Sequence, residues 1–258
     1  MYHSMTFIKN YYAQKNTWDD WHLIPTSRPV INPPTVKTKE IEIPGSDDVI
    51  DLTESLKGYP IYGNREGSLE FIVENGHKEW RLIYSEILNF LNGQYMKVIL
   101  EDDLAHYYEG RFSVNEWKSD PHWSVITIDY NLKPYKLAVH RSIEDWEWDP
   151  FDFEDGIIQQ DFFYDIEVNS DSFATRNYSN VQLVGRKPVC PSFGVTSSEG
   201  ITIKLYNEEL GISVTKTFEN GWTKDPDFIF SNISMDNYLL VSFKGYGKVS
   251  IDFRSGGL

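Results

Sequence analysis

The sequence predicts a mostly β protein, and three observations support that prediction. Aromatic residues make up 15% of the 258 residues, and aromatic side chains favour the pleated, half-buried surface of a strand. Several segments alternate apolar and polar residues with a period of two, as strands with one buried face do. Glycine, proline, asparagine and aspartate cluster between these segments, which is the composition of turns.

The clearest alternation lies in two segments of the N-terminal half. In residues 69–73 a leucine, a phenylalanine and a valine share one face, and in residues 126–130 two isoleucines and a tyrosine do so. Shorter stretches of the same kind recur at 164–168, 201–205, 212–214 and 249–253. We therefore expect many strands, distributed over the whole chain.

One segment departs from this pattern and predicts a helix. Its apolar residues are spaced by three and four positions, and they are Trp80, Ile83, Tyr84, Ile87, Leu88 and Leu91. This spacing places all six on one face of an amphipathic helix. Asn75-Gly76 precedes the segment, Glu79 suits the positive N-terminal end, and Gly93 suits a left-handed C-cap. About sixteen residues at ~1.5 Å each would span roughly 24 Å, enough to cover one sheet face.

The length of the chain suits one or two domains, and either arrangement can bury a core without disulfides or metals. A boundary is expected near Leu132-Lys133-Pro134-Tyr135-Lys136, because the proline ends the preceding strand and the sequence then becomes strongly acidic. We therefore expect an N-terminal domain over residues 1–136 and a C-terminal domain over residues 137–258.

The charge balance disfavours two classes of partner. There are 24 lysines and arginines against 39 aspartates and glutamates, a formal net charge of −15, so the phosphates of nucleic acid and anionic lipids would be repelled. Cys190 is the only cysteine, which suits folding in a reducing compartment. The first residues lack the features of a signal peptide, and no apolar run approaches the ~20 residues of a membrane span. We expect synthesis in the cytoplasm, no membrane insertion and no specific nucleic-acid binding.

The sequence contains none of the common catalytic motifs. The six histidines show neither His-x-x-x-His nor HExxH spacing. A Walker loop, a dinucleotide fingerprint and a G-x-S-x-G elbow are also missing from the sequence. We therefore expect no enzymatic activity, no cofactor and no metal site.

An acidic and aromatic tract, residues 142–175, contains no lysine or arginine. Its candidate ligand-binding or partner-binding residues are Trp146, Trp148, Asp149 and Asp152. Aromatic rings beside carboxylates suit sugar binding, and oxygen ligands suit calcium, although the spacing of an EF-hand fails because Phe151 would be the first ligand. The alternative is a surface loop with its acids in water and its aromatic rings anchored on the core.

Short signatures follow one another along the chain. In the N-terminal half they are Ile43-Pro44-Gly45-Ser46-Asp47, Ile50-Asp51-Leu52-Thr53, Tyr62-Gly63-Asn64-Arg65, Leu91-Asn92-Gly93, Asp102-Asp103, Tyr107-Tyr108-Glu109-Gly110-Arg111 and Pro134-Tyr135-Lys136. In the C-terminal half they are Gly185-Arg186-Lys187-Pro188-Val189-Cys190-Pro191-Ser192-Phe193 and Arg254-Ser255-Gly256-Gly257-Leu258. In this order and spacing they resemble the distal tail protein (Dit) family of siphovirus-type bacteriophages and related prophages. Asp48, Asn92 and Leu104 depart from the usual residues of that family.

The resemblance implies an N-terminal belt domain, a β-sandwich with one helix and a hairpin, and a C-terminal galectin-like β-sandwich. It implies a structural virion protein, folded and assembled in the bacterial host cytoplasm. In the virion the subunits would form a hexameric ring at the distal end of a long non-contractile tail, around the DNA-exit channel. The implied partners are other copies of the chain, the major tail tube protein, the tape measure protein and the tail-associated tip or baseplate proteins. An acidic lumen would repel the phosphates of exiting DNA.

Residues within these signatures are candidates for ring contacts or for the geometry of the belt domain, namely Tyr62, Asn64, Arg65, Gly110 and Arg111. Arg65 and Arg111 are favoured as interface residues, because arginine is enriched where planar hydrogen-bonding groups meet partners. The alternative for all of them is ordinary turn and core packing within one subunit.

Two other functions remain open. One is a carbohydrate-binding module of a tail-tip adhesion device, with Trp146, Trp148 and Trp222 as platforms for sugar rings. The other is a tail-associated glycan hydrolase that uses two carboxylates of the tract 142–175, which would have to face one cleft about 5 to 10 Å apart.

Overall fold

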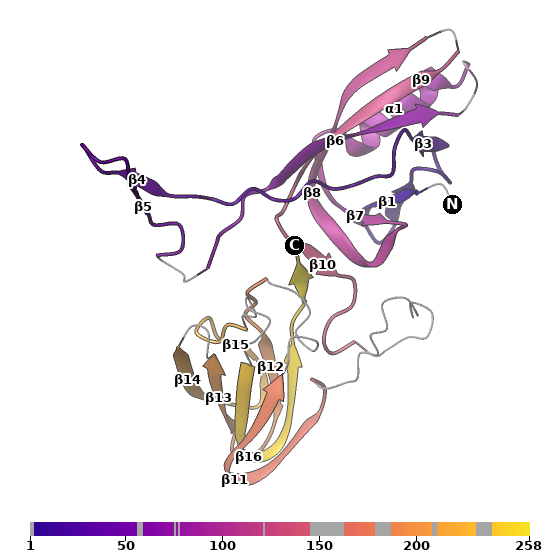
Figure 1. Ribbon diagram of the computed structural model, residues 1–258. Coiled ribbons are helices and arrows are strands. Elements are labelled where there is room, and N and C mark those ends of the chain that lie inside the picture. The colour runs from indigo at the N-terminus through magenta and orange to yellow at the C-terminus, as the bar shows by residue number, and fades with distance from the viewer. Residues whose placement is uncertain are drawn as a thin grey trace. The chain divides into compact units, whose positions relative to one another are not determined.

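The computed structural model describes residues 3–55, 59–74, 76, 78–120, 122–144, 163–178, 187–207, 211–230 and 239–258. In these residues nearly all regular structure is antiparallel strand, and α1 is their single α-helix (Figure 1). The predicted mostly β fold class is therefore confirmed. The chain divides into two compact units, Met1–Lys136 and Leu137–Leu258, and each unit has its own hydrophobic core.

The first unit is built on an antiparallel sheet with the strand order β2-β1-β7-β8-β9-β6-β3. Its strands are β1 (Met5–Asn10), β2 (Ala13–Asn16), β3 (Leu23–Pro25), β6 (Arg65–Val73), β7 (Gln94–Leu100), β8 (Asp103–Ser119) and β9 (Ser124–Leu132). The two alternating segments predicted from the sequence pair with each other, since Leu69 lies opposite Ile128 and Phe71 opposite Ile126. All four side chains are buried, so the predicted faces are confirmed.

Helix α1 (Trp80–Leu91) packs its apolar face on the core of this sheet. Trp80, Ile83, Ile87 and Leu91 are buried, as their spacing predicted. The helix has 12 residues, fewer than expected, but its C-terminal end is where the sequence placed it. Gly93 has a φ of 69°, the left-handed conformation predicted for the C-cap.

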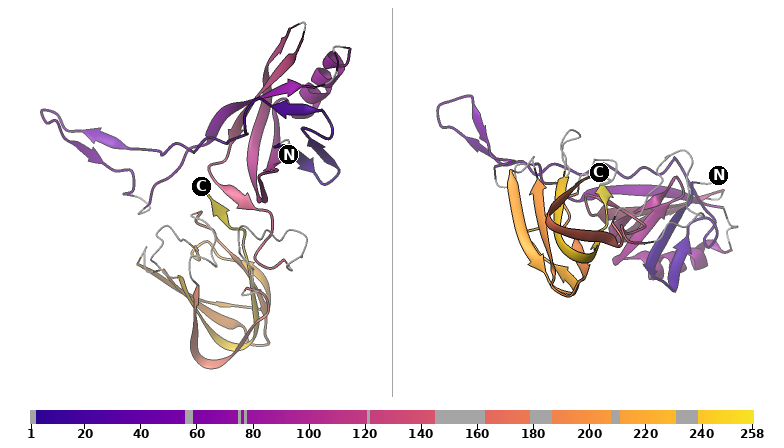
Figure 2. Two further views of the ribbon diagram at one scale, coloured as in Figure 1. Left: turned by 45° about the vertical axis from the view of Figure 1, so that its right-hand side comes forward. Right: turned by 90° about the horizontal axis from the view of Figure 1, so that it is seen from below.

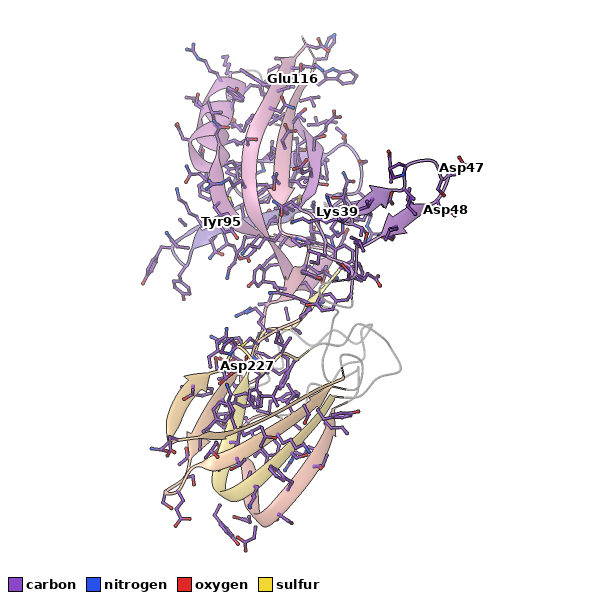
Figure 3. The ribbon with its side chains drawn as sticks, turned by 90° about the vertical axis from the view of Figure 1, so that its left-hand side faces the viewer. Lys39, Asp47, Asp48, Tyr95, Glu116 and Asp227 are labelled. Atoms are coloured by element: carbon purple, nitrogen blue, oxygen red, sulfur yellow. The ribbon has the colours of Figure 1, made fainter. Side chains whose placement is uncertain are left out.

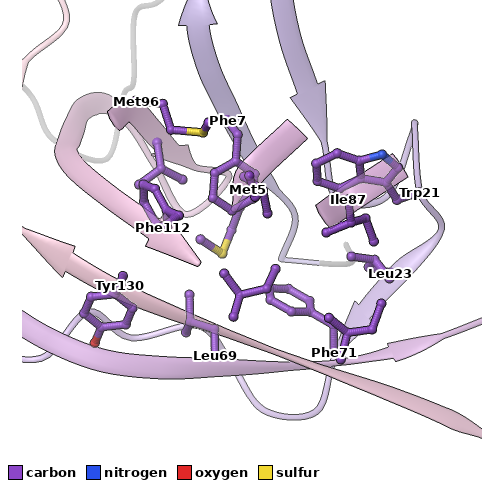
Figure 4. Close-up of a cluster of buried hydrophobic side chains, with 14 of the residues drawn as sticks. Met5, Phe7, Trp21, Leu23, Leu69, Phe71, Ile87, Met96, Phe112 and Tyr130 are labelled. Carbon is purple, nitrogen blue, oxygen red and sulfur yellow. The ribbon is translucent and has the colours of Figure 1, made fainter. Parts of the chain in front are cut away.

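Aromatic rings fill the centre of the first unit. Phe7 meets Phe112 edge to face with 5.0 Å between ring centroids, and Trp21 lies 6.2 Å from Phe7. Figure 4 shows these rings together with Met5, Ile87 and Met96 from the surrounding elements. This packing joins the sheet and α1 through one shared hydrophobic core.

The second unit contains a curled antiparallel sheet with the strand order β14-β13-β16-β12-β15, and β11 pairs along the other edge of β16. Its strands are β11 (Ile166–Tyr178), β12 (Ser192–Thr196), β13 (Ile201–Asn207), β14 (Ile212–Phe218), β15 (Gly221–Lys224) and β16 (Leu239–Asp252). A short strand, β17 (Gly256–Gly257), pairs with β10 (Lys136–Ala138). Aromatic side chains again fill the core, among them Phe193, Phe218, Phe228 and Phe230.

Strand β16 is long enough to pair with two different strands along one edge. Its first half pairs with β13 and its second half with β12. The change occurs at Gly245 and Gly247, whose φ angles of 133° and 143° are open to glycine and rare for other residues. Beyond this change β12 takes the place of β13 beside β16, and β15 pairs with the outer edge of β12.

Candidate assembly surfaces

An arm leaves the sheet of the first unit between β3 and β6. We define the arm as residues 36–55 and 59–62, which include β4 (Glu40–Glu42) and β5 (Val49–Asp51). Its base is closed by pairing of Val36 with Tyr62 and by a 2.8 Å hydrogen bond from the Lys37 amide to the Ile61 carbonyl. Figures 1 and 2 show β4 and β5 standing apart from the other strands of this unit.

The arm exposes aliphatic side chains that a strand normally buries. Ile41 lies opposite Ile50 in the β4–β5 ladder, and Ile41, Val49 and Ile50 are 45%, 51% and 47% exposed. A two-stranded ribbon is marginally stable in water by itself. Ile41 and Ile50 share one face of the ribbon and Val49 lies on the other, so both faces expose apolar side chains, as surfaces that contact a partner often do.

The arm also carries a strong negative charge. Glu40 lies directly opposite Asp51, a like-charge pair that weakens the ladder. Asp47 and Asp48 add two carboxylates at its tip, while Lys39 lies nearer its base (Figure 3). A partner surface with basic groups would relieve this repulsion on the face that also carries Val49.

Arg65 anchors the root of the arm and does not face solvent. Its side chain is buried, Nη1 donates to the Asn32 carbonyl at 2.9 Å, and Nε donates to the Pro134 carbonyl at 2.8 Å. The guanidinium carbon lies 5.5 Å from the centre of the Tyr108 ring. Burial lowers the pKa of Arg65. These contacts fix the segment that enters the arm against the edge of the sheet.

Two more of the sequence candidates lie at the same root. The Tyr62 ring meets Tyr135 edge to face at 5.9 Å between centroids. Nδ2 of Asn64 donates to Oδ1 of Asn131 at 2.6 Å. The backbone amide of Asn32 also donates to the Tyr130 hydroxyl at 2.9 Å, which connects the segment before the arm to β9. Tyr62, Asn64 and Arg65 are therefore brought together by the fold, around the base of the arm.

Gly110 lies at a close approach between β8 and β9. A Cβ at this position would lie 2.2 Å from the Asn131 carbonyl oxygen and 2.6 Å from the Cα of Leu132. Both are backbone atoms, so neither can rotate away. The position requires glycine because of the sheet itself, whatever the sheet contacts outside.

Arg111 lies on the solvent-exposed face of the same sheet, opposite the face that carries the buried Phe112. It lies between Tyr95 on β7 and Asn131 on β9, and Asn131 lies opposite Glu66 on β6. All four side chains are exposed, and the Arg111 guanidinium donates to the Gly93 carbonyl at 2.9 Å. This row across four strands is a polar surface that presents an arginine to solvent; we call it the open row.

A cluster of charged side chains links the start of β8 to the first residue of β10. Oδ1 of Asp103 lies 2.7 Å from Nδ1 of His106, and its Oδ2 accepts from Nζ of Lys136 at 2.6 Å. Burial opposes ionisation of Asp103, but the hydrogen bonds and attraction from His106 and Lys136 outweigh it and lower its pKa to about 2. The carboxylate therefore stays ionised in the folded chain well below pH 4.

Asp103→Asn should lower the free energy of unfolding at pH 7 by about 2 kcal/mol. The depressed pKa contributes stability above the ordinary value of 3.8, and this stability is lost as the pH falls towards 2. Urea unfolding at pH 7 and at pH 2.5 checks this, because the gap between the two proteins should shrink at the lower pH. The exposed Asp227→Asn serves as the control and should change stability little at either pH. An equal gap at both pH values would contradict the role of Asp103.

The remaining sequence candidates, Trp146, Trp148, Asp149 and Asp152, lie outside the described residues. Within the part of the chain that is described, no group of three or more histidine, cysteine, aspartate or glutamate side chains is placed to hold a metal ion. None of the described helices has the length and apolar character needed to span a bilayer.

Sequence reasoning singled out the root of the arm but missed the exposed aliphatic residues beyond it. The alternation of Glu40, Ile41, Glu42 and Ile43 was a signal of a strand with one covered face. Among the residues that the structure describes, this strand pairs only with β5.

The sequence matches no family model, and no curated protein matches it. The structure is similar to the crystal structure of the Dit protein (gp 19.1) of phage SPP1, with a TM-score of 0.62, 13% sequence identity and 99% of each chain covered. That protein is described as a paradigm of the hub of the adsorption apparatus in phages that infect Gram-positive bacteria. The resemblance to distal tail proteins predicted from the sequence is thereby confirmed at the level of the fold.

Proposed function

We propose that the chain is a structural subunit of a phage tail tip, and that six copies form a ring around the DNA-exit channel. The observation that carries this proposal is the fold shared with the SPP1 Dit protein along 99% of both chains. A fold that matches from end to end, with both units included, supports a similar architectural role more strongly than a match to one domain would.

In this proposal residues 1–136 form the belt domain that closes the ring, and residues 137–258 form a galectin-like domain. The ring joins the tail tube to the tip or baseplate, so its partners are the major tail tube protein, the tape measure protein and the tail-associated tip proteins. The chain works in the virion without catalysis, after folding in the cytoplasm of the bacterial host.

The arm supplies a contact suited to such a ring. Identical subunits close a ring through a heterologous interface, in which one patch of a subunit meets a different patch of its neighbour. An exposed ribbon with aliphatic side chains and carboxylates offers the first patch. Arg111, in the open row, is our candidate for the second, since its positive charge complements the acidic arm.

In the same proposal Tyr62, Asn64 and Arg65 act as positioning residues. They hold the root of the arm and do not themselves contact the neighbour. Gly110 has a similar indirect role, because it allows β8 and β9 to approach closely enough to support the face that carries Arg111.

The mass of the purified chain tests the ring directly. Light scattering should give six times the mass of one chain, and negative-stain images should show a six-fold particle with a central hole. Charge reversal by Arg111→Glu should lower the average mass of the assembly, because fewer subunits associate. Arg111→Lys keeps the charge and should lower that mass less. A strict monomer at high protein concentration, also in the presence of the neighbouring tail proteins, would rule the ring out.

A further inference from the structure

An exposed tryptophan of the second unit is held flat on a strand backbone. Trp222 on β15 lies directly opposite Gly194 on β12, and its side chain is 57% exposed. A Cβ on Gly194 would lie 2.8, 2.8 and 2.9 Å from Cε2, Cζ2 and Cη2 of the indole. Three consecutive ring atoms at nearly equal distances mean that the glycine lies under the face of the ring. One face of the indole therefore packs on Gly194, and the opposite face is open to solvent.

This arrangement differs from an ordinary surface aromatic residue. A free indole would sample several rotamers, and a ligand that stacked on it would have to immobilise it at an entropic cost. Here the missing side chain of Gly194 provides a seat that holds the ring against the sheet. A rigid aromatic platform with one open face is preorganised to stack against a flat apolar surface.

Polar side chains continue the same sheet face beside the ring. Gly194 lies opposite Ser250 on β16, and the Ser250 hydroxyl accepts from the backbone amide of Asp165 at 3.1 Å. Nζ of Lys248, two residues from Ser250 and so on the same face, lies 3.0 Å from Oδ2 of Asp165. With strands about 4.8 Å apart, these groups begin within one or two strand spacings of the platform.

The side chains of this face can hydrogen-bond to hydroxyl groups. Lys248 donates only, the Asp165 carboxylate accepts only, and both are about half exposed. A hydroxyl both donates and accepts, so it can bridge such a pair. Below the face the sheet is firm, because Phe193, Val249 and Ile251 are fully or almost fully buried.

We propose that the face formed by Trp222, Gly194, Ser250, Lys248 and Asp165 binds a neutral hexopyranoside. A pyranose presents a patch of C–H groups on one face, which suits the electron-rich face of an indole, and hydroxyls around its rim, which suit Lys248 and Asp165. The ligand is neutral because Lys248 is already paired, and the net charge of −15 repels anionic sugars. This inference does not depend on the proposed ring.

Saturation-transfer NMR on the full-length protein tests the proposal. The probes are the methyl glycosides of β-galactose, β-glucose, α-mannose and β-N-acetylglucosamine. We expect transfer to the ring C–H protons of at least one of them, and none to the anionic methyl glycoside of N-acetylneuraminic acid. Titration of the best probe should give a dissociation constant that Trp222→Ala weakens at least about tenfold.

Three variants separate the platform from other effects. Trp222→Phe keeps a smaller ring and should retain part of the binding. Gly194→Ala should weaken binding although it leaves Trp222 in place, because the added methyl group lifts the ring from its seat. Trp123→Ala is the matched control, since Trp123 is also a highly exposed tryptophan but belongs to the first unit, and it should bind like the unmodified protein.

The thermal unfolding midpoint of each variant establishes that it is folded. No transfer from the unmodified protein to any of the four neutral glycosides would overturn the proposal. So would equal affinity of Trp222→Ala and the unmodified protein for the best probe, or a loss of binding in Trp123→Ala as large as in Trp222→Ala.

Discussion

Replacing Ile41, Val49 and Ile50 together by serine should leave a folded subunit that no longer forms the ring. The three side chains are about half exposed and lie outside the hydrophobic core, so their loss should change the stability of the subunit little. In the proposed ring the neighbour would enclose the ribbon, covering Ile41 and Ile50 on one face and Val49 on the other. Full burial of one aliphatic side chain is worth about 1.5–3 kcal/mol, and because these side chains are already about half buried, the three substitutions together would cost each interface about 2–4 kcal/mol.

Light scattering under conditions where the unmodified chain assembles measures this effect, and a thermal midpoint confirms folding. A matched control replaces three other exposed aliphatic residues of the first unit, Val30, Leu82 and Leu104, by serine. The control should keep the mass of the unmodified protein. If the arm variant assembled at the same protein concentration as the unmodified chain, the arm would contribute nothing to the interface.

Gly110→Ala should destabilise the first unit by at least about 3 kcal/mol. The new methyl group would meet backbone atoms of β9 at 2.2 and 2.6 Å, so the two strands must separate or lose pairing. Gly76→Ala is the control, because nothing lies within 4 Å of a Cβ built at that position. Urea unfolding followed by tryptophan fluorescence reports largely on the first unit, which holds five of the eight tryptophans, and similar midpoints for the two variants would contradict the expected clash.

The sequence predicted those parts of the fold that depend on local periodicity. Period-two alternation identified the buried faces of β6 and β9, and spacing by three and four identified the buried face of α1. Both patterns arise because each side chain contacts the core of its own unit. Gly93 was also predictable, because the end of a helix favours a left-handed residue at a fixed position.

The candidate surfaces were less accessible to sequence reasoning. Arg65 was favoured as an interface residue because of its chemistry, yet its partners are carbonyls of Asn32 and Pro134, far away in the sequence. Trp222 was recognised as a possible platform, but its seat on Gly194 depends on the pairing of β12 with β15. Register between distant strands is decided by the whole core, and a single sequence does not display it.

The root of the arm has a consequence for the size of the proposed ring. Because Arg65 and Tyr130 bind the Asn32 segment directly to the sheet, the direction in which the arm leaves is a property of the individual subunit. In the proposed ring, where the arm contacts the neighbour, this direction would set the angle between adjacent subunits. Loosening this joint would therefore yield rings of mixed subunit number or open chains, and the bore of the channel would lose its fixed diameter.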